Sequence, residues 1–599
     1  MLAELRTPDL AVLVIYFVLL VGAGFYFRKR SASVEGFTVA NRSLPGWVCG
    51  LSIFGTYLSS NTFIGVPGKA YGGNWNGFVF SLSLPISAYI AVKWFVPFYR
   101  KNAGLSAYEH LEKRFGPWAR MYAVACYLLT QISRVGTIMF GVAVGLSALT
   151  GWELETIIIV SGIAVTLYTL LGGIEAVIWT DAIQSVILTL GAIFVVVLIL
   201  TGMPEGAGQA LTLANEAEKF SLGDMGLSFA SSTVWVMLLY GIFINLTNFG
   251  IDQNFVQRYH AADSEKAAGR SVWMGALLYM PVALMFFFIG SILFSYYQEH
   301  PALLEDVRLA KATELIAEQS PGLAKGSPEA AAEAKRLAAA MEPTDYNDNV
   351  LPHFIANRIP AGLAGLLIAA LFAAAMSSID TSLNSSSTIA LQDFYRRWFR
   401  PGATEAESLR FLRIMTVVFG LIGTSVALAM MGVKSILDAW WKISGVFAGG
   451  MLGLFLLGFI SRRATNAGSA LGATIGVLVI LWMTFSPNWS GIDGKINVLE
   501  MSKKLVGTNT KFEDQLKVDE LVDIDGYKYK IVSIESQSQL TVDKIVSKDS
   551  PISNATIYRV TNLYWFRSPF HSNMITVIGT LSIFLVGLGA SRILGRKRG

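Results

Sequence analysis

Cysteine and charge are both scarce in this sequence of 599 residues. Only 15% of its residues are charged, whereas soluble domains carry about 25% charged residues. The two cysteines, Cys49 and Cys126, lie in apolar stretches, so the sequence indicates no disulfide framework and no redox compartment. With 53% hydrophobic residues, the composition argues against a soluble fold.

Motifs for catalysis, metal binding and ATP hydrolysis are also missing. The histidines do not have the spacing of metal ligands: they are His110, His260, His300, His353 and His571. The absence of a Walker-type Gly-Lys-Ser/Thr loop disfavours an ATP-driven pump. Neither a nucleophile with its base nor a repeated selectivity filter is visible, so an enzyme and a channel are weaker hypotheses than a transporter. We predict no enzymatic activity and no cofactor.

Long apolar stretches are abundant instead. A helix needs about 20 apolar residues to cross a hydrocarbon core of ~30 Å, and the hydropathy profile predicts about thirteen spans. They lie near residues 9–27, 46–66, 77–99, 118–148, 155–172, 176–203, 231–256, 271–297, 361–390, 409–431, 436–460, 467–485 and 571–594. The first follows Glu4 and Arg6 without a small-residue cleavage site, so we expect it to remain as an anchor. The sequence predicts an all-α multi-pass membrane protein.

Basic residues concentrate in alternate connections between these spans. The set comprises Arg28, Lys29, Arg30, Arg100, Lys101, Lys113, Arg114, Arg258, Lys266, Arg270, Arg396, Arg397, Arg400, Arg462, Arg463, Arg592, Arg596, Lys597 and Arg598. The positive-inside rule makes that side cytoplasmic, which predicts an external N-terminus, an internal C-terminus and a place in the inner (plasma) membrane of the cell. No basic module with interleaved aromatics stands outside the spans, so nucleic-acid binding is disfavoured.

Two long connections on the opposite side interrupt the spans. Residues 299–349 show helical periodicity, and residues 494–560 alternate polar and apolar side chains as strands do. We predict five parts: an extra N-terminal helix with its linker (1–45), a core with the outer helical loop 299–349 (46–460), an additional helix (461–493), a small extramembrane β module (494–560) and a C-terminal helix (561–599).

The second span has a polar centre that contains glycine. Gly55, Thr56 and the run Ser59-Ser60-Asn61-Thr62 interrupt its apolar pattern. Lipid offers no partner for free backbone or polar groups, and transporters use unwound helices whose carbonyls face a binding cavity. We interpret this stretch as a broken helix at a binding site. The alternative is a small-residue face for helix packing.

The ninth span carries a polar stripe. Ser377, Asp380, Thr381 and Asn384 are three or four residues apart, so they share one face of a helix. A charge at membrane depth costs at least ~2.5 to 3.5 kcal/mol and persists mainly where it has a partner or a task. Hydroxyl and carboxylate oxygens suit a small hard cation, which makes the stripe and the second span candidates for a sodium site. The alternative is bonding of the hydroxyls to the backbone.

Further polar residues lie inside spans. Asp181 begins the sixth span, where it is either a carboxylate favoured by the helix dipole or a cation ligand. Arg134 lies too deep to snorkel; its guanidinium either holds a substrate carboxylate through two parallel hydrogen bonds or pairs with Asp181 or Asp380. Asn245 and Asn248 give the seventh span a polar face, which either joins helices or contacts a ligand.

Four separated motifs make the chain resemble the sodium/solute symporter family. They are Ser59-Ser60-Asn61-Thr62-Phe63-Ile64-Gly65; Gly172-Gly173 with Ala176-Val177-Ile178-Trp179-Thr180-Asp181 and Gln184; Asp252-Gln253 with Val256-Gln257-Arg258; and Ser377-Ser378 with Leu383-Asn384. The resemblance covers about residues 8–485. It implies a leucine-transporter-like fold, in which two inverted five-helix repeats begin at the second span after an extra helix.

The same resemblance implies two cation sites. The shared sodium site would use backbone oxygens and two hydroxyls, from Gly55, Leu58, Ala374, Ser377 and Ser378. A second cation site, which only some members have, would use Asp181, Ser377, Asp380 and Thr381. Asp380 stands where we expect a hydroxyl residue, and two carboxylates near one site either tighten sodium binding or let one of them hold a proton. The number of sodium ions per cycle therefore stays open. Sodium is the coupling ion in this interpretation, and no other metal is implied.

The substrate positions differ from those of sugar-transporting relatives. Where such relatives carry an acidic residue, a lysine and a glutamine, this chain has Ser81, Tyr279 and Trp441. Arg134, in Thr130-Gln131-Ile132-Ser133-Arg134, is instead similar to the arginine with which sialic acid symporters hold the substrate carboxylate. By analogy, the substrate contacts are Tyr57, Ser59, Thr62, Ser81, Arg134, Asn245 and Asn248.

The sequence thus predicts a sodium-coupled importer of a small carboxylate-bearing solute, with sialic acid or a related acidic sugar as the leading substrate. A sodium/neutral sugar symporter of the glucose/galactose type is the alternative within transporters, and an ion channel is the alternative from another class. We expect sodium, the small-molecule substrate and membrane lipid to be the partners of a monomer.

Overall fold

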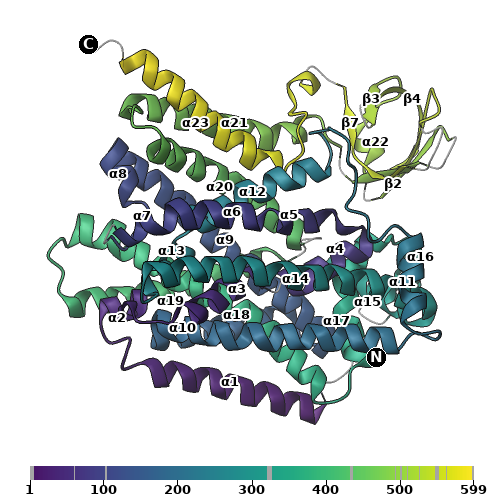
Figure 1. Cartoon of the computed structure of the whole chain (residues 1–599). Coiled ribbons are helices and arrows are strands. Elements are labelled where there is room, and N and C mark those ends of the chain that lie inside the picture. Colours follow the sequence, from purple (N-terminus) through teal and green to yellow (C-terminus); the bar gives the residue numbers. More distant parts are fainter. Residues whose placement is uncertain are drawn as a thin grey trace.

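The apolar stretches form long helices packed side by side. A computed structural model of the chain describes residues 6–595 except 60, 102–103, 320–326, 432–435, 493, 499–501, 509, 525–526, 547–551 and 561–562. Among the described helices, ten are long and apolar enough to cross a membrane, and they run between two ends of the molecule (Figure 1). A helix satisfies its backbone hydrogen bonds internally, as lipid requires. The protein is a multi-pass membrane protein, while the predicted number of thirteen spans and their orientation stay predictions.

These ten helices and the remaining ones have the following bounds. The ten are α1 (Thr7–Phe27), the segmented helix Trp75–Lys101, α9 (Pro117–Thr150), α10 (Leu154–Thr201), α12 (Val234–Ile251), α14 (Glu265–Glu299), α18 (Leu363–Ile389) with its continuation η5 (Ala390–Phe399), α19 (Glu405–Ala429), α21 (Asn466–Phe485) and α23 (Met574–Gly595). The segmented helix consists of η3 (Trp75–Phe78), α5 (Val79–Leu82), α6 (Leu84–Ile90), η4 (Ala91–Phe95) and α7 (Val96–Lys101). The others are α2 (Val34–Val39), η1 (Ala40–Arg42), α3 (Gly46–Tyr57), η2 (Asn61–Gly65), α4 (Val66–Gly72), α8 (Glu109–Phe115), α11 (Ala207–Glu216), α13 (Gln253–Ala261), α15 (Pro301–Gln319), α16 (Pro328–Ala339), α17 (Pro343–Arg358), α20 (Ile436–Ile460), η6 (Ser486–Trp489), α22 (Phe512–Gln515) and η7 (Tyr564–Phe566).

Two helices are interrupted by a residue in extended conformation. The helix α3 ends at Tyr57, the next residue Leu58 is extended (φ −85°, ψ 114°), and helical structure resumes in η2 and α4. The helix α12 ends in the same way at Asp252 (φ −75°, ψ 122°), before α13 begins. The first break confirms the predicted broken second span, although Ser60 lies outside the described residues. The sequence analysis does not predict the second break, because Asn248 and Asp252 have the four-residue spacing of one continuous helix face.

A third break lies inside α10. Gly173 has a φ of 58°, which is readily accessible to glycine and strained for other residues. The Ser31 hydroxyl donates to the carbonyl of Gly172 (2.6 Å), and Arg30 pairs with the buried Glu175 (Nη1–Oε1 2.6 Å). The linker after α1 is therefore attached to the break, which separates the stretches predicted as the fifth and sixth spans.

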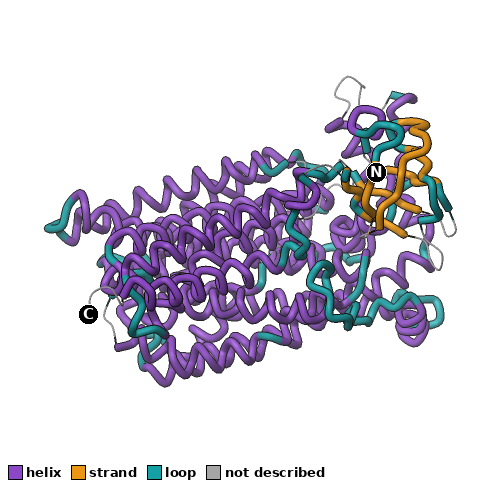
Figure 2. The backbone as a smooth tube through the Cα atoms, turned by 90° about the horizontal axis from the view of Figure 1, so that it is seen from above, coloured by secondary structure: helices purple, strands orange, loops and turns teal. Residues whose placement is uncertain are grey.

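The second long connection folds as an antiparallel sheet beside one end of the bundle (Figure 2). Its strands are β1 (Lys495–Val498), β2 (Lys504–Thr508), β3 (Leu521–Ile524), β4 (Tyr527–Ser536), β5 (Gln539–Val542), β6 (Ile552–Ala555) and β7 (Ile557–Arg559), in the spatial order β6-β1-β2-β5-β4-β3-β7. Ile496, Leu505 and Ile531 belong to its buried core. The hydroxyl of Tyr564, in the segment that leads to α23, donates to Asp523 on β3 (2.6 Å). This bond fastens the sheet to the helical part.

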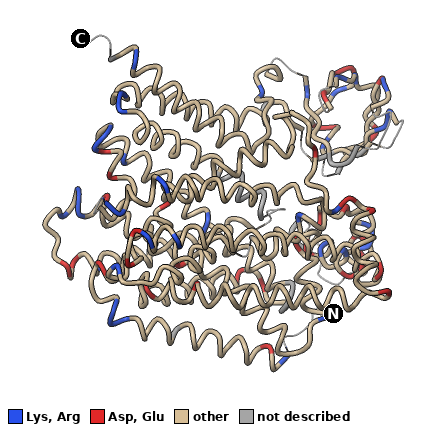
Figure 3. The backbone as a smooth tube through the Cα atoms, in the orientation of Figure 1, with Lys and Arg blue, Asp and Glu red and all other residues tan. Residues whose placement is uncertain are grey.

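The two ends of the molecule differ in structure and charge. One end, here called the module end, carries the sheet together with α11, α15 and α16 (Figure 1). The opposite end, here called the basic end, carries lysine and arginine residues in the loops between helices (Figure 3). Arg28 and Lys29 after α1 are examples of its exposed basic residues. The connections predicted to be basic therefore lie at the basic end, with the exception of the one that contains Arg258, which is described below.

Candidate functional site

The two broken helices face a common cavity of about 140 Å³. Six of the seven predicted substrate contacts line it: Tyr57, Ser59, Thr62, Ser81, Arg134 and Asn248. The seventh, Asn245, lies behind Tyr57, because its side-chain oxygen accepts from the Tyr57 hydroxyl (3.1 Å) and its amide nitrogen donates to Ser83 (2.9 Å). The fold thus brings together residues that are up to 191 positions apart in the sequence.

Arg134 presents its guanidinium to this cavity from α9. Its Nη2 donates to the carbonyl of Thr56 (2.8 Å), close to the break after α3. Within the described part of the chain, the ion pairs do not include Arg134, and Asp181 is paired with Arg258 instead. The described ion pairs therefore contradict the alternative in which Arg134 is the internal partner of Asp181 or Asp380. The guanidinium has donors left for a bound group, since an arginine carries five N–H donors.

The cavity also contains residues that the sequence analysis does not assign to it. They include Tyr127, Gln131, Asp252 and Tyr279. Asp252 is held by the backbone N–H of Asn254 (2.8 Å) and by Gln131 (3.4 Å), so one carboxylate accompanies Arg134 in the lining. The rings of Tyr57 and Tyr279 pack with their centroids 5.1 Å apart, which places an aromatic wall where sugar-transporting relatives are expected to have a lysine. The side chain of Trp441 lies outside the described part of the structure.

The predicted sodium ligands lie where α3 contacts α18. The hydroxyl oxygens of Ser377 and Ser378 are buried, and neither has a hydrogen-bond partner among the described residues. Such unsatisfied polar atoms are costly, which is the condition that a bound cation would relieve. Gly55 packs closely here, since a Cβ on it would lie 2.4 Å from the Ser185 hydroxyl. Ala374 is buried on α18 one turn before Ser378.

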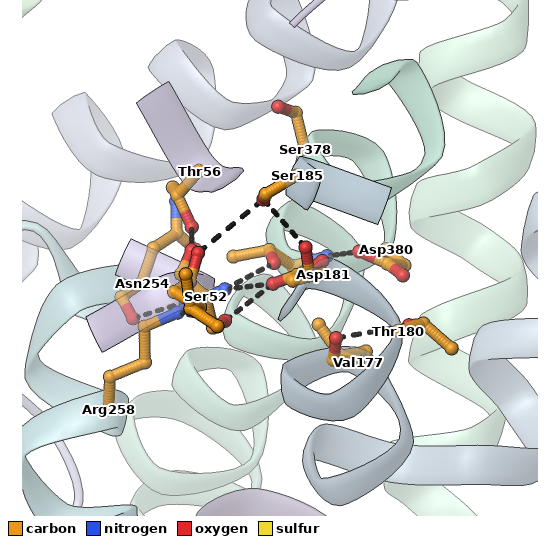
Figure 4. A network of polar contacts seen from close by, with 12 residues as sticks. Ser52, Thr56, Val177, Thr180, Asp181, Ser185, Asn254, Arg258, Ser378 and Asp380 are labelled. Carbon is orange, nitrogen blue, oxygen red and sulfur yellow. Dashed lines mark hydrogen bonds and ion pairs between the residues drawn. The ribbon is translucent and has the colours of Figure 1, made fainter. Parts of the chain in front are cut away.

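A network of buried charges surrounds Asp181 (Figure 4). One oxygen of Asp181, Oδ2, accepts from Ser52 (2.6 Å) and from Arg258 (Nη2, 2.8 Å). Arg258 Nη2 also donates to the Thr381 hydroxyl (2.9 Å). The Oδ1 atom of Asp181 and the Oδ2 atom of Asp380 are buried without a partner among the described residues. Two carboxylates and one guanidinium give the network a formal charge of −1.

Arg258 corrects one of the sequence predictions. Its basic side chain was expected in a cytoplasmic connection, yet it is 0% exposed. Besides Nη2, its Nε donates to Ser52 (2.8 Å) and its Nη1 to the carbonyl of Asn254 (2.8 Å). The positive-inside rule fails here because α13, although polar, is buried along its whole length. The motif Asp252-Gln253 with Arg258 is the sequence signal for this burial, since it places the arginine next to a polar break in a helix.

Two other motif residues have structural partners. Asn384, the fourth member of the polar stripe, donates to the carbonyl of Phe37 (3.2 Å) and accepts from Gln257 (3.2 Å). It therefore ties α18 to α2 and α13. Gln184 donates to the hydroxyl of Tyr16 on α1 (2.8 Å), so the extra N-terminal helix reaches the region next to the network.

Comparisons with known proteins fit this geometry. The sodium:solute symporter family matches residues 37–476. The sodium/sialic acid symporter NanT of Aliivibrio fischeri is 32% identical over 535 residues, which cover 88% of this chain and 97% of NanT. The sodium/sialic acid symporter SiaT of Proteus mirabilis is 32% identical over 499 residues, covering 82% and 92%. The solved structure of a Na⁺-coupled sialic acid symporter, in a substrate-bound outward-open state, aligns over 98% of both chains with a TM-score of 0.74 and 26% identity.

Proposed function

This chain belongs to the sodium:solute symporter family, and from that premise we propose that it imports sialic acid or a related acidic sugar together with sodium. It is accordingly a transporter and not an enzyme. The relatives named for sodium/sialic acid symport support the substrate class. The observation that carries the proposal is the position of Arg134, whose guanidinium lines the cavity with the other predicted contacts and is absent from the ion pairs of the described residues.

The cavity chemistry fits an acidic, hydroxylated solute. Arg134 offers a planar pair of donors for a carboxylate, and Ser59, Thr62 and Ser81 offer hydroxyl groups to the sugar. A volume of about 140 Å³ is below the ~300 to 1,000 Å³ of pockets that enclose drug-sized ligands. The solute can therefore occupy the cavity only when the surrounding helices move apart, which alternating access requires.

The coupling ion would bind between α3 and α18. We assign it the backbone oxygens of Gly55, Leu58 and Ala374 and the hydroxyls of Ser377 and Ser378, whose oxygens are otherwise unsatisfied. The chemistry suits sodium, a hard cation that prefers oxygen ligands. Since α3 also leads into the substrate cavity, ion binding and solute binding would stabilise the same arrangement of the broken helix.

A second cation would bind at Asp181, Ser377, Asp380 and Thr381. The free Oδ1 of Asp181 and the free Oδ2 of Asp380 support this assignment. The network has a formal charge of −1 even with Arg258 in place, and one monovalent cation would neutralise it. With a hydroxyl residue at position 380, the negative charge of Asp181 and the positive charge of Arg258 would already neutralise each other. Asp380 therefore favours a tightly held second sodium ion in this chain.

Topology and assembly complete the proposal. The division at Gly173 supports thirteen spans, the basic end would be cytoplasmic by the positive-inside rule, and the module end would be extracellular. The protein would lie in the inner (plasma) membrane. A monomer suffices, because one chain supplies every proposed ligand.

The test is a calorimetric titration of the purified protein, in the presence of sodium, with sialic acid and with its neutral amide analogue. We expect the acid to bind at least about tenfold more tightly, since a lost charged hydrogen bond costs about 1.5 to 3 kcal/mol. Equal binding of acid and amide would contradict the role of Arg134 and favour a neutral sugar. Sodium-driven uptake into proteoliposomes, with neutral sugars, monocarboxylates and amino acids as competitors, identifies the transported class.

A further inference from the structure

A second cavity, of about 530 Å³, lies at the module end. Its polar lining comes from three separate stretches of the chain and includes Lys69, Asn76, Asp224, Ser232, His571 and Asn573. Lys69 lies on α4, Asn76 on η3, Asp224 and Ser232 in the segment before α12, and the last two precede α23. None of these residues is among the predicted substrate contacts.

The two cavities adjoin each other at Gly77, which lines both. Asn76, which precedes Gly77 in the chain, lines the module-end cavity. Phe80 and Ser81, which follow Gly77, line the central cavity. The same succession occurs along α4, where Val66 lines the central cavity and Lys69 the module-end cavity. A solute that arrives from the module end therefore meets the larger cavity first.

The wall of the module-end cavity is fixed by hydrogen bonds. The side chain of Asn76 accepts from the Ser232 hydroxyl (2.8 Å) and donates to the carbonyl of Leu222 (3.0 Å). The ammonium of Lys219 donates to the carbonyls of Tyr71 (2.7 Å) and Gly73 (3.2 Å), so it holds the segment before α12 against the end of α4. Burial lowers the pKa of Lys219 to about 8. A wall built in advance reduces the entropy cost of binding.

We propose that the module-end cavity is a second recognition site, which holds an acidic, hydroxylated solute before that solute reaches the central cavity. Lys69 would attract the carboxylate, and the amide, hydroxyl and carboxylate groups of Asn573, Ser232 and Asp224 would bond the hydroxyls of the sugar. The volume of about 530 Å³ lies within the ~300 to 1,000 Å³ of clefts and cavities that bind small molecules. This inference rests on the proposed function, because it assigns the same solute class to both cavities.

The test compares calorimetric binding of sialic acid to the full-length protein and to four variants. We expect the wild type to show a tight and a weak binding event. Arg134→Lys weakens the tight event about thirtyfold or more and keeps the weak one, and adding Lys69→Gln to it removes the weak event. In sodium-driven uptake, Lys69→Gln raises KM about fivefold, as for a partly exposed charge contact, with little change in the maximal rate. Lys335→Gln, which removes an exposed lysine of α16, is the matched control and keeps wild-type values.

Ser232→Trp provides a variant that leaves Lys69 and its contacts intact. Ser232 is exposed at the cavity rim, so we expect the indole to fill the cavity and to remove the weak event, at the loss of one hydrogen bond to Asn76. A single binding event in the wild type, together with unchanged KM in Lys69→Gln and Ser232→Trp, would overturn the inference while the proposed function stands. Absence of any sialic acid binding to the wild type would overturn the proposed function itself.

Discussion

Two arginines within the helical bundle show how differently the same side chain is used. Arg258 is fully buried, and its described contacts are with Ser52, Asn254, Asp181 and Thr381. Arg134 bonds the carbonyl of Thr56 and otherwise faces a cavity. The first arginine holds several helices together, whereas the second keeps donors for a ligand. A buried charge is therefore a candidate for recognition only when its internal partners do not use it up.

The largest effect is expected from removing the internally paired arginine. Arg258→Met leaves the carboxylate of Asp181 buried without its partner, which costs about 3 to 5 kcal/mol. We expect a large loss of folded protein and a lower thermal unfolding temperature, measured by fluorescence-detected size exclusion. Adding Asp181→Asn should restore part of the stability, because the uncompensated charge is then gone. Arg134→Met should cost only about 1 kcal/mol, the value of one hydrogen bond. Equal losses at both arginines would remove the distinction between them.

The second effect concerns the buried hydroxyls of Ser377 and Ser378, which have no hydrogen-bond partner among the described residues. Ser377→Ala combined with Ser378→Ala should abolish sodium-dependent uptake in proteoliposomes, because the hard cation loses two oxygen ligands. Folding should be retained, since neither hydroxyl has a described partner. Ser382→Ala is the control on the same helix, where the hydroxyl bonds the carbonyl of Ser378 (2.8 Å). Undiminished uptake in the double variant would refute the sodium assignment.

The third effect sharpens the role of the cavity arginine. Arg134→Lys keeps the charge and loses the planar pair of donors, so substrate affinity should fall about thirtyfold or more, at about 2 to 5 kcal/mol for a lost charged contact. Sodium binding and thermal stability should remain close to wild type. Calorimetry with sialic acid gives the first quantity and sodium-dependent tryptophan fluorescence the second. A disturbed sodium response with normal substrate binding would assign Arg134 to the charge network instead.

The fourth effect tests the charge of the network. Asp380→Ser replaces the carboxylate by the expected hydroxyl and brings the formal charge of the network from −1 to zero. The second cation should bind more weakly, so the Hill coefficient for sodium should fall from about 2 toward about 1 while transport continues. Sodium titration of uptake measures it. An unchanged coefficient would mean that Asp380 has a structural role only.

The smallest effect is expected outside the bundle. Replacing residues 494–560 by a Gly/Ser linker should change uptake by less than about twofold, because the described residues of the sheet do not line either cavity. Surface labelling of an engineered cysteine before α23 checks correct insertion. A correctly inserted but inactive variant would show that transport requires the sheet as well as the helical bundle that holds the two arginines.

A local sequence pattern predicts the structure correctly where that pattern has one structural outcome. Apolar length predicts helices, and the break after Tyr57 follows from polar and glycine residues that a lipid-facing helix would not tolerate. The sequence does not predict the break at Asp252, because the polar residues around it also fit one face of a continuous helix. Arg258 was misplaced because the rule for basic residues assumes that connections are exposed, and α13 is buried.

By itself, the sequence determined that the chain is a multi-pass helical membrane protein, which helix is broken first, and which polar residues are candidates for ligands. Those properties follow from hydropathy and spacing along one helix. Only the tertiary structure decided which charges neutralise each other and which remain available. The pairing of Asp181 with Arg258 joins residues 77 positions apart, and the module-end cavity is formed by three stretches of the chain. Electrostatic energy and cavity shape depend on distances across helices, and these distances exist only after the helices have packed.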